Sequence, residues 1–168
     1  MGYRVLMLDL DPQADLTRQF GVAETQIGMD ALLSFKDDAR DVILPLSEQL
    51  SLIASGPELH LFEQQTPSIK LGVKLKQLLT STIQSDADII LIDCAAISGL
   101  LGTNAVLAAS DMLIPVSAEH GALRGMIKML PVLQRVAKLR SDSIRLWLCL
   151  NRLPDGTDFA YQFGDLLT

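Results

Sequence analysis

Residues 5–11 of the chain read VLMLDLD, and this stretch decides the fold class. Its four consecutive apolar residues predict a strand with both faces buried, like the strands of parallel sheets. We place that strand at residues 3–8, and two aspartates, Asp9 and Asp11, follow it. Ligands of open α/β sheets bind beyond the carboxyl ends of the strands. The stretch therefore predicts an α/β protein with a site near these carboxylates.

The rest of the chain alternates between apolar runs and helical patterns. Further strands are expected at residues 50–54, 87–92, 111–116 and 144–150. Helices are expected at residues 16–20, 29–34, 58–65, 71–83, 103–109 and 125–139. This alternation predicts a doubly wound, mostly parallel sheet flanked by helices, within a single domain of residues 1–168.

Composition and apolar stretches limit the class of protein. The net charge of −6 argues against a protein that coats nucleic acid over its whole surface. Two cysteines, Cys94 and Cys149, are too few for a disulfide framework, so we expect buried free thiols. Residues 89–109 are strongly apolar, but Asp93 and Asn104 within them favour a strand, a loop and a helix over a membrane span. We expect a cytoplasmic protein without a signal peptide and without membrane contact.

Polar residues stand at the expected carboxyl ends of three strands. They are Asp9, Asp11, Asp93, Asn151 and Arg152. Carboxylates at neighbouring strand ends suit a hydrated Mg²⁺ ion, which takes one or two carboxylates plus phosphate oxygens. They equally suit the orientation of an attacking water. The alternative is that each aspartate caps the turn or helix that follows it.

Three blocks of the sequence resemble the ParA/MinD family of P-loop ATPases. Residues 6–22, LMLDLDPQADLTRQFGV, are similar to the family motif often written DxDPQGNLT. Residues 52–59, LIASGPEL, resemble a strand and turn midway through ParA proteins. Residues 89–130 resemble the Walker B region and its continuation, IILIDCAAISGLLGTNAVLAASDMLIPVSAEHGALRGMIKML. Because the blocks occur in the family's order, the resemblance implies a P-loop NTPase-like fold of the SIMIBI class.

The resemblance implies a role for each carboxylate. Asp11 matches the carboxylate that positions the attacking water, and Asp93 matches the Walker B carboxylate that binds Mg²⁺ through water. Asp9 precedes Asp11 by two residues, so it points to the same side of a strand and is a weaker metal candidate. Asp15 ends a DPQAD sequence similar to the DPKAD of the nitrogenase iron-protein branch, where the matching residue lies near the nucleotide-bound Mg²⁺.

The implied cofactors are ATP or ADP together with Mg²⁺. Asn151 and Arg152 resemble the end of a late strand that contacts adenine in the family. The implied function is a partitioning ATPase that acts in chromosome or plasmid segregation. In that mechanism ATP drives dimerisation, the dimer binds DNA non-specifically, and a ParB-like protein stimulates hydrolysis on the nucleoid. Basic residues around the helix at 125–139 suit DNA, and the alternative is a solvated helix face.

The sequence departs from the family at the phosphate-binding loop. Family members begin with a strand and a G-x-x-x-x-G-K-[ST] loop, whose backbone N–H groups and lysine hold the phosphates. No such sequence occurs in residues 1–168, which start where the family has its next strand. We therefore expect a fold without that first strand and without the family's C-terminal elements. We also expect no measurable ATP hydrolysis by these residues alone.

Two other readings of the chain stay open. One is a non-catalytic, truncated or degenerate paralogue that acts as an interaction module, with a second copy or a full-length ParA-like ATPase as its partner. The other is a fragment from a wrong start site or a split gene. In the family the strand with the phosphate loop lies between the strands that end in Asp11 and Asp93. Without it, these strands either pair directly or leave unpaired edges that promote association.

Overall fold

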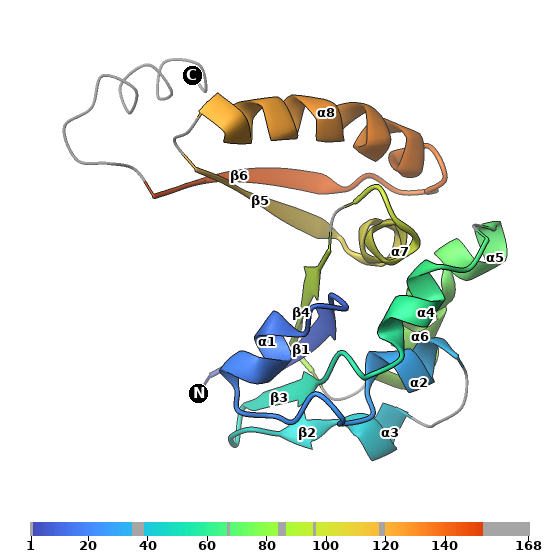
Figure 1. The fold of residues 1–168 in the computed structure, drawn as a ribbon, viewed down its shortest axis with the longest axis vertical. Helices are drawn as coiled ribbons and strands as arrows, with labels where there is room; N and C mark the ends of the chain where they lie inside the picture. Colours follow the sequence, from blue (N-terminus) through green and yellow to red (C-terminus); the bar gives the residue numbers. More distant parts are fainter. Residues whose placement is uncertain are drawn as a thin grey trace. The chain divides into compact units, whose positions relative to one another are not determined.

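The computed structural model describes residues 2–34, 39–66, 68–83, 87–95, 97–117 and 120–152. The chain forms two compact units, Met1–Ala109 and Ser110–Thr168 (Figure 1). Across the described ranges, no helix is long and apolar enough to cross a membrane.

A four-stranded sheet forms the centre of the first unit. Its strands are β1 (Val5–Leu10), β2 (Leu44–Pro45), β3 (Leu50–Ile53) and β4 (Ile89–Cys94). The order across the sheet is β2-β3-β1-β4. Strand β1 runs parallel to both β3 and β4, while β2 runs antiparallel to β3. The prediction of an α/β fold with a mostly parallel sheet is confirmed.

Short helices connect these strands. They are α1 (Asp15–Gln19), α2 (Met29–Leu33), α3 (Ala39–Val42), α4 (Leu59–Glu63), α5 (Ile69–Gly72), α6 (Lys74–Leu78), the π-helix η1 (Leu79–Ile83) and α7 (Leu100–Ala108). The sequence pattern did not predict β2 or α3, because both are too short to show a period.

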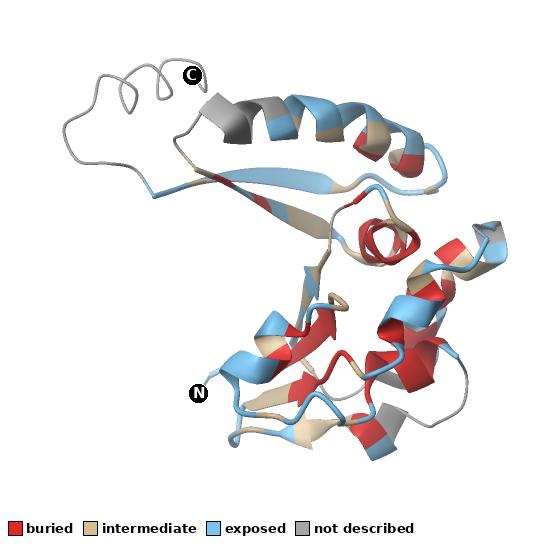
Figure 2. Ribbon diagram, in the orientation of Figure 1, coloured by how far each residue is buried: buried red, intermediate tan, exposed pale blue. Residues whose placement is uncertain are grey.

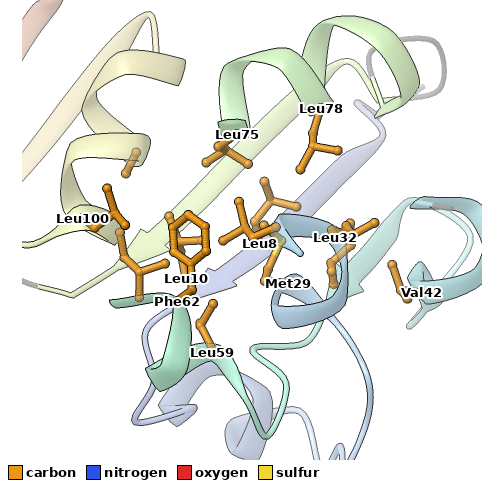
Figure 3. Close-up of a cluster of buried hydrophobic side chains, with 14 of the residues drawn as sticks. Leu8, Leu10, Met29, Leu32, Val42, Leu59, Phe62, Leu75, Leu78 and Leu100 are labelled. Carbon is orange, nitrogen blue, oxygen red and sulfur yellow. The ribbon is translucent and has the colours of Figure 1, made fainter. Parts of the chain in front are cut away.

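The core of the first unit lies on one face of the sheet. Leu6, Leu8 and Leu10 alternate along β1 and point into it, as the two-residue period of a strand requires. The facing helices supply further buried residues, among them Met29, Leu32, Leu59, Phe62, Leu75 and Leu100 (Figure 3). Figure 2 shows buried residues gathered on β1 and on these helices. Each fully buried leucine stabilises the fold by about 1.5–3 kcal/mol relative to an exposed one.

The opposite face of the sheet is covered less evenly. Helix α1 contacts β1 there, because Thr17 hydrogen-bonds to Asp9, which points away from the core. On β4, Ile89 and Leu91 point to the same side and are 39% and 53% exposed. Helix α1 therefore shields β1 and leaves the outer residues of β4 in water.

Both carboxylate-bearing strands continue past their predicted ends. The strand predicted at residues 3–8 is β1, and it runs through Asp9 to Leu10. The strand predicted at residues 87–92 is β4, and it runs through Asp93 to Cys94. The prediction that the first strand ends at residue 8, before Asp9, is therefore wrong. Aspartate is unfavourable in strands, but at position 9 it finds hydrogen-bond donors on α1.

The helix predicted at residues 71–83 is broken into α5, α6 and η1. Asn104 of α7 takes part in the break, since its Nδ2 donates to the Leu71 carbonyl over 2.9 Å and its Oδ1 accepts from the Leu75 amide over 3.1 Å. A side chain from a distant helix thus satisfies backbone groups near the break between α5 and α6. Periodicity within residues 71–83 cannot reveal this partner.

Strands β1 and β4 pair directly over six residues, from Val5 opposite Ile89 to Leu10 opposite Cys94. The strands that carry Asp9 and Asp93 are therefore neighbours, with nothing between them. Strand β4 is the last strand of this sheet within the described residues. Within the described residues, no strand pairs with the outer edge of β4. The side chains of Ile89 and Leu91 on this strand are exposed.

The second unit contains two parallel strands and one helix. Strands β5 (Asp111–Ser117) and β6 (Arg145–Asn151) pair over seven residues, and α8 (His120–Ala137) connects them. Ile114 and Val116 of β5 are buried, together with Leu133 and Val136 of α8. On the other face of the strands, Leu113 is 65% and Trp147 55% exposed.

The two cysteines are free thiols, but their burial differs from the prediction. Cys94 is half-buried at the end of β4, and Cys149 is exposed on β6. The expectation of a buried thiol is wrong for Cys149, because it lies on the face of β6 that no described helix covers.

Candidate functional site

The register of the sheet brings the predicted carboxylates together. Asp9 lies directly opposite Asp93 in the pairing of β1 with β4. Asp11 directly follows the last residue of β1. Asp15, four residues further along the chain, begins α1. The negative charges of Asp9, Asp11 and Asp15 all act on Asp93 at the carboxyl end of the sheet.

Asp9 is fully buried, and the protein itself uses both of its carboxylate oxygens. Oδ2 accepts hydrogen bonds from the amide of Thr17 over 2.8 Å and from its Oγ1 over 2.6 Å. Oδ1 accepts from the Asp11 amide over 3.2 Å. Asp9 therefore joins the end of β1 to α1, and these three donors compensate for the burial of its charge.

Asp11 lies in a tight turn and keeps part of its carboxylate available. Its Oδ1 accepts from the Gln13 amide over 2.8 Å, and its carbonyl accepts from the Ala14 amide over 2.9 Å. Ala14 has a left-handed backbone with φ 55°, which closes the turn before α1. Among the described residues, no donor meets Oδ2 of Asp11. That oxygen is free to accept a hydrogen bond from a water.

Asp15 is exposed and is paired with a cation. Its side chain is 69% exposed and forms an ion pair with Arg18, which also pairs with Glu24 over 3.0 Å. The hydrogen bonds that Arg18 donates, first to Glu24 and then to Asp15, raise the pKa of Arg18. The Asp15 carboxylate therefore has a partner within α1 before any metal is considered.

Asp93 carries the electrostatic signature of the site. Partial desolvation, followed by the negative charges of Asp9, Asp11 and Asp15, raises the pKa of Asp93 above its usual value. The same surroundings raise the pKa of the neighbouring Cys94 thiol. A cation placed among these carboxylates would relieve their repulsion, so the donor set fits a divalent ion such as Mg²⁺.

The described carboxylates do not form a complete metal cage. No group of three or more Asp, Glu, His or Cys side chains in the described ranges comes close enough to hold a metal ion by itself. Mg²⁺ commonly binds through one or two carboxylates with water and phosphate oxygens as its other ligands. Asp93 and Asp11 would hold such an ion or its waters, and the remaining ligands would come from a bound phosphate group.

Two further polar residues, Ser55 and Glu63, connect elements of the first unit and were not predicted from the sequence. Ser55, at the end of β3, donates from Oγ to the Asp11 carbonyl over 2.8 Å and from its amide to Thr17 Oγ1 over 3.1 Å. Glu63 of α4 accepts from the first two amides of α7, Leu100 and Leu101, over 2.9 and 2.8 Å. Ser55 stands where a strand adjacent to an Asp-bearing strand ends, and that position is the signal that could have identified it.

Asn151 and Arg152, the predicted adenine contacts, belong to the second unit. They stand at the carboxyl end of β6, and both are exposed. The Arg152 amide donates to Asn151 Oδ1 over 2.8 Å, and Arg152 has a left-handed backbone with φ 51°. Their predicted role in holding adenine stays a prediction.

The chain is similar in sequence to known proteins. The model of the AAA domain family matches residues 1–146. The sporulation initiation inhibitor protein Soj of Bacillus subtilis is 32% identical over 167 residues, which are 96% of this chain and 66% of that protein. The chromosome-partitioning ATPase Soj of Treponema pallidum is 30% identical over 141 residues, covering 80% of this chain and 53% of that protein.

Among solved structures, a plasmid partition protein of Borrelia burgdorferi bound to AMPPNP has the same fold. It superposes with a TM-score of 0.84 at 23% identity, covering 99% of this chain and 70% of that one. The chain thus spans roughly half to two thirds of the length of the two Soj proteins it matches. The match over residues 1–146, with the Asp-bearing strands β1 and β4 inside it, shows that the chain belongs to the AAA domain family, in its ParA/MinD group of P-loop ATPases.

Proposed function

We propose that this chain is the part of a ParA-type partitioning ATPase that carries its catalytic and metal-binding carboxylates. The complete ATPase would serve chromosome or plasmid segregation. The observation that carries the proposal is the register of β1 with β4, which sets Asp9 opposite Asp93 and brings Asp11 to the same edge. Phosphoryl transfer depends on positioning and charge stabilisation, so carboxylates placed at this edge are the groups it needs for the metal and the water.

Each carboxylate has a distinct part in the proposal. Asp93 would hold Mg²⁺ through water. Desolvation and then the neighbouring negative charges raise the pKa of Asp93, and a cation would offset those charges. Asp11 accepts a hydrogen bond from the attacking water through its free Oδ2. Asp9 positions Asp11 rather than touching the metal, because its oxygens already accept three hydrogen bonds from the chain. Asp15 contributes charge at the rim of the site.

The phosphate-binding part of the ATPase does not occur in residues 1–168. The sequence contains no G-x-x-x-x-G-K-[ST] loop. A lysine and a row of backbone N–H groups normally neutralise and hold the β- and γ-phosphates. Without them the carboxylates would repel the phosphates of ATP. We therefore expect residues 1–168 alone neither to bind ATP tightly nor to hydrolyse it.

Equilibrium binding of a fluorescent ATP analogue with Mg²⁺ tests this part of the proposal. The chain and an Asp93→Ala variant are compared, with near-ultraviolet circular dichroism to show that both are folded. We expect weak binding, with a Kd above the millimolar range, that is equal in the two proteins. Tight binding that Asp93→Ala removes would contradict the proposal, because the chain would then possess a complete nucleotide site.

A second candidate function is a protein-interaction module of the same family. The exposed apolar side chains of Leu91 on β4, and of Leu113 and Trp147 on the second unit, favour it. A second copy of the chain or a full-length ParA-like ATPase is the partner in this reading. Co-purification with such an ATPase, dependent on Leu91, would favour it over the catalytic reading.

Other parts of the partition role are proposed for the complete ATPase, because the family implies them. They are ATP-dependent dimerisation, stimulation by a ParB-like protein and location on the nucleoid. For DNA, the chain itself offers α8, where Lys128 and Arg135 are exposed, and the exposed Lys138 directly after it. Lys128 and Arg135 are seven residues apart and so share one face of the helix. Such a row suits contacts to phosphates along a DNA backbone.

A further inference from the structure

We infer that Ser55 and Thr17 are positioning residues that fix the Asp11 turn by joining the ends of β1 and β3. The inference rests on the proposed role of Asp11 in orienting water, and it adds the residues that hold Asp11 in place. Ser55 lies 44 residues from Asp11 in the sequence. Within the described part of the chain, it is the only distant residue that hydrogen-bonds to Asp11.

The hydrogen atoms of this network have a single consistent arrangement. The Asp9 carboxylate can only accept, so Thr17 Oγ1 must donate its hydrogen to Asp9 Oδ2. A lone pair of Thr17 Oγ1 then accepts from the Ser55 amide. The Asp11 carbonyl can only accept as well, so Ser55 Oγ donates to it. Each hydroxyl is therefore fixed in direction, and neither can rotate without losing a bond.

Burial makes this arrangement costly to disturb. Asp9 and Ser55 are 0% exposed and Thr17 is 1% exposed. Removing the Thr17 hydroxyl leaves the buried Ser55 amide without its partner. Removing the Ser55 hydroxyl breaks the bond that ties the Asp11 carbonyl to the end of β3, although that carbonyl keeps the Ala14 amide as a donor. The other hydrogen bonds of Asp11 are local. Its amide donates to Asp9, and it accepts from the amides of Gln13 and Ala14. Local bonds shape the turn, while Ser55 ties it to the sheet.

Ser55 is itself held from the other side. Its carbonyl accepts from the Asp30 amide over 3.1 Å. The buried Asp30 carboxylate accepts from the amides of Gly28, Ala31 and Glu58. Gly56 has φ +92° and lies so close to Asp30 that a Cβ atom would overlap the carboxylate. These contacts hold the turn after β3 in place. The hydrogen bond from Ser55 to the Asp11 carbonyl therefore restrains the Asp11 turn.

The experiment compares full chains carrying Ser55→Ala, Thr17→Val and Thr17→Ser with the parent. Thr17→Ser keeps the hydroxyl and serves as the conservative rescue. Ser51→Ala, four residues earlier and within β3, is the control for loss of a serine hydroxyl. NMR measures amide hydrogen exchange at Gln13 and Ala14 relative to the β1–β4 amides in the same sample, together with the ¹³C shift of the Asp11 carboxyl group.

We expect Ser55→Ala and Thr17→Val to raise exchange at Ala14 by about tenfold over the strand amides, since local opening is measured separately from global unfolding. We also expect them to move the Asp11 carboxyl shift, while Thr17→Ser and Ser51→Ala leave both near the parent values. If Ser55→Ala and Thr17→Val lower global stability but leave the Asp11 turn unchanged, the residues are structural only and the inference fails.

A separate readout keeps this result apart from the proposed function. Mn²⁺ alone, added to the parent chain, should broaden the signals of Asp11 and Asp93 before those of other exposed carboxylates. Absence of that broadening would count against the metal role of the cluster. It would not alter the exchange comparison, which decides whether Ser55 and Thr17 position Asp11.

Discussion

Asp93 is the residue at which the electrostatics of the site can be measured directly. Desolvation and three neighbouring carboxylates raise its pKa. An aspartate with a raised pKa in the folded state favours folding while it is protonated, and that contribution disappears as the pH rises through the folded pKa. At neutral pH the ionised Asp93 therefore opposes folding, as expected of a group kept for binding a cation.

We predict that Asp93→Asn stabilises the chain at pH 7 and has no effect at a pH below the ordinary pKa of aspartate. The gain should stay below about 1 kcal/mol, because water screens an exposed carboxylate. Urea unfolding of both proteins between pH 3 and pH 7 measures it. Asp88→Asn is the matched control and should destabilise at neutral pH, since hydrogen bonds from Arg4 lower the pKa of Asp88. A parent chain that is more stable than Asp93→Asn at pH 7 would refute the prediction.

At the scale of elements, Asn104 maintains the broken helix of residues 69–83. It is fully buried and satisfies backbone groups of Leu71, Leu75 and Leu100 with its amide. We predict that Asn104→Leu lowers the free energy of unfolding by roughly 2–4 kcal/mol, because buried backbone groups lose their partners. Chemical denaturation measures the loss, and Gln77→Leu on the exposed side of α6 should change stability by less than about 0.5 kcal/mol. Equal losses in the two variants would show that Asn104 has no bridging role.

Strand β4 is open to association. Its outer edge is unpaired among the described residues, and Leu91 is 53% exposed. We predict that the chain self-associates and that Leu91→Lys shifts it toward monomer in sedimentation equilibrium. Leu61→Lys is the matched control, because Leu61 is 48% exposed but lies on α4. A parent chain that is monomeric throughout the accessible concentration range would contradict this view of β4.

These elements also show how far the sequence alone leads. The apolar runs at residues 5–8 and 89–92 predict the two central strands, because burial on both faces leaves an unambiguous pattern. The carboxylates Asp11 and Asp93 are identified as neighbours for the same reason. Ser55, Glu63 and Asn104 are not, since their roles depend on partners at least 29 residues away. Local patterns predict elements, and only the folded chain shows which side chains connect them.

For the whole molecule, DNA binding would depend on α8 despite the net charge of −6. We predict that if the chain binds DNA, Lys128→Ala and Arg135→Ala each weaken binding uniformly across sequences. Each should lower the slope of log K against log salt by about 1, as loss of a phosphate contact does. Fluorescence anisotropy with a short duplex at several salt concentrations measures the slope. As a control, Arg4→Ala removes an exposed cation from the first unit and should leave the slope unchanged. If the α8 variants also leave the slope unchanged, that face of α8 does not contact DNA and the prediction fails.

If residues 1–168 retain the carboxylates of a partitioning ATPase, a phosphate-binding loop should restore their activity. Mg²⁺-dependent ATP hydrolysis by a fusion protein measures this. The fusion places the strand, G-x-x-x-x-G-K-[ST] loop and following helix of a ParA/MinD-family ATPase ahead of Gly2. We predict turnover by the fusion, none by residues 1–168 alone, and loss of turnover on Asp11→Ala. A folded fusion that binds ATP but does not hydrolyse it, or hydrolysis that survives Asp11→Ala, would contradict the account.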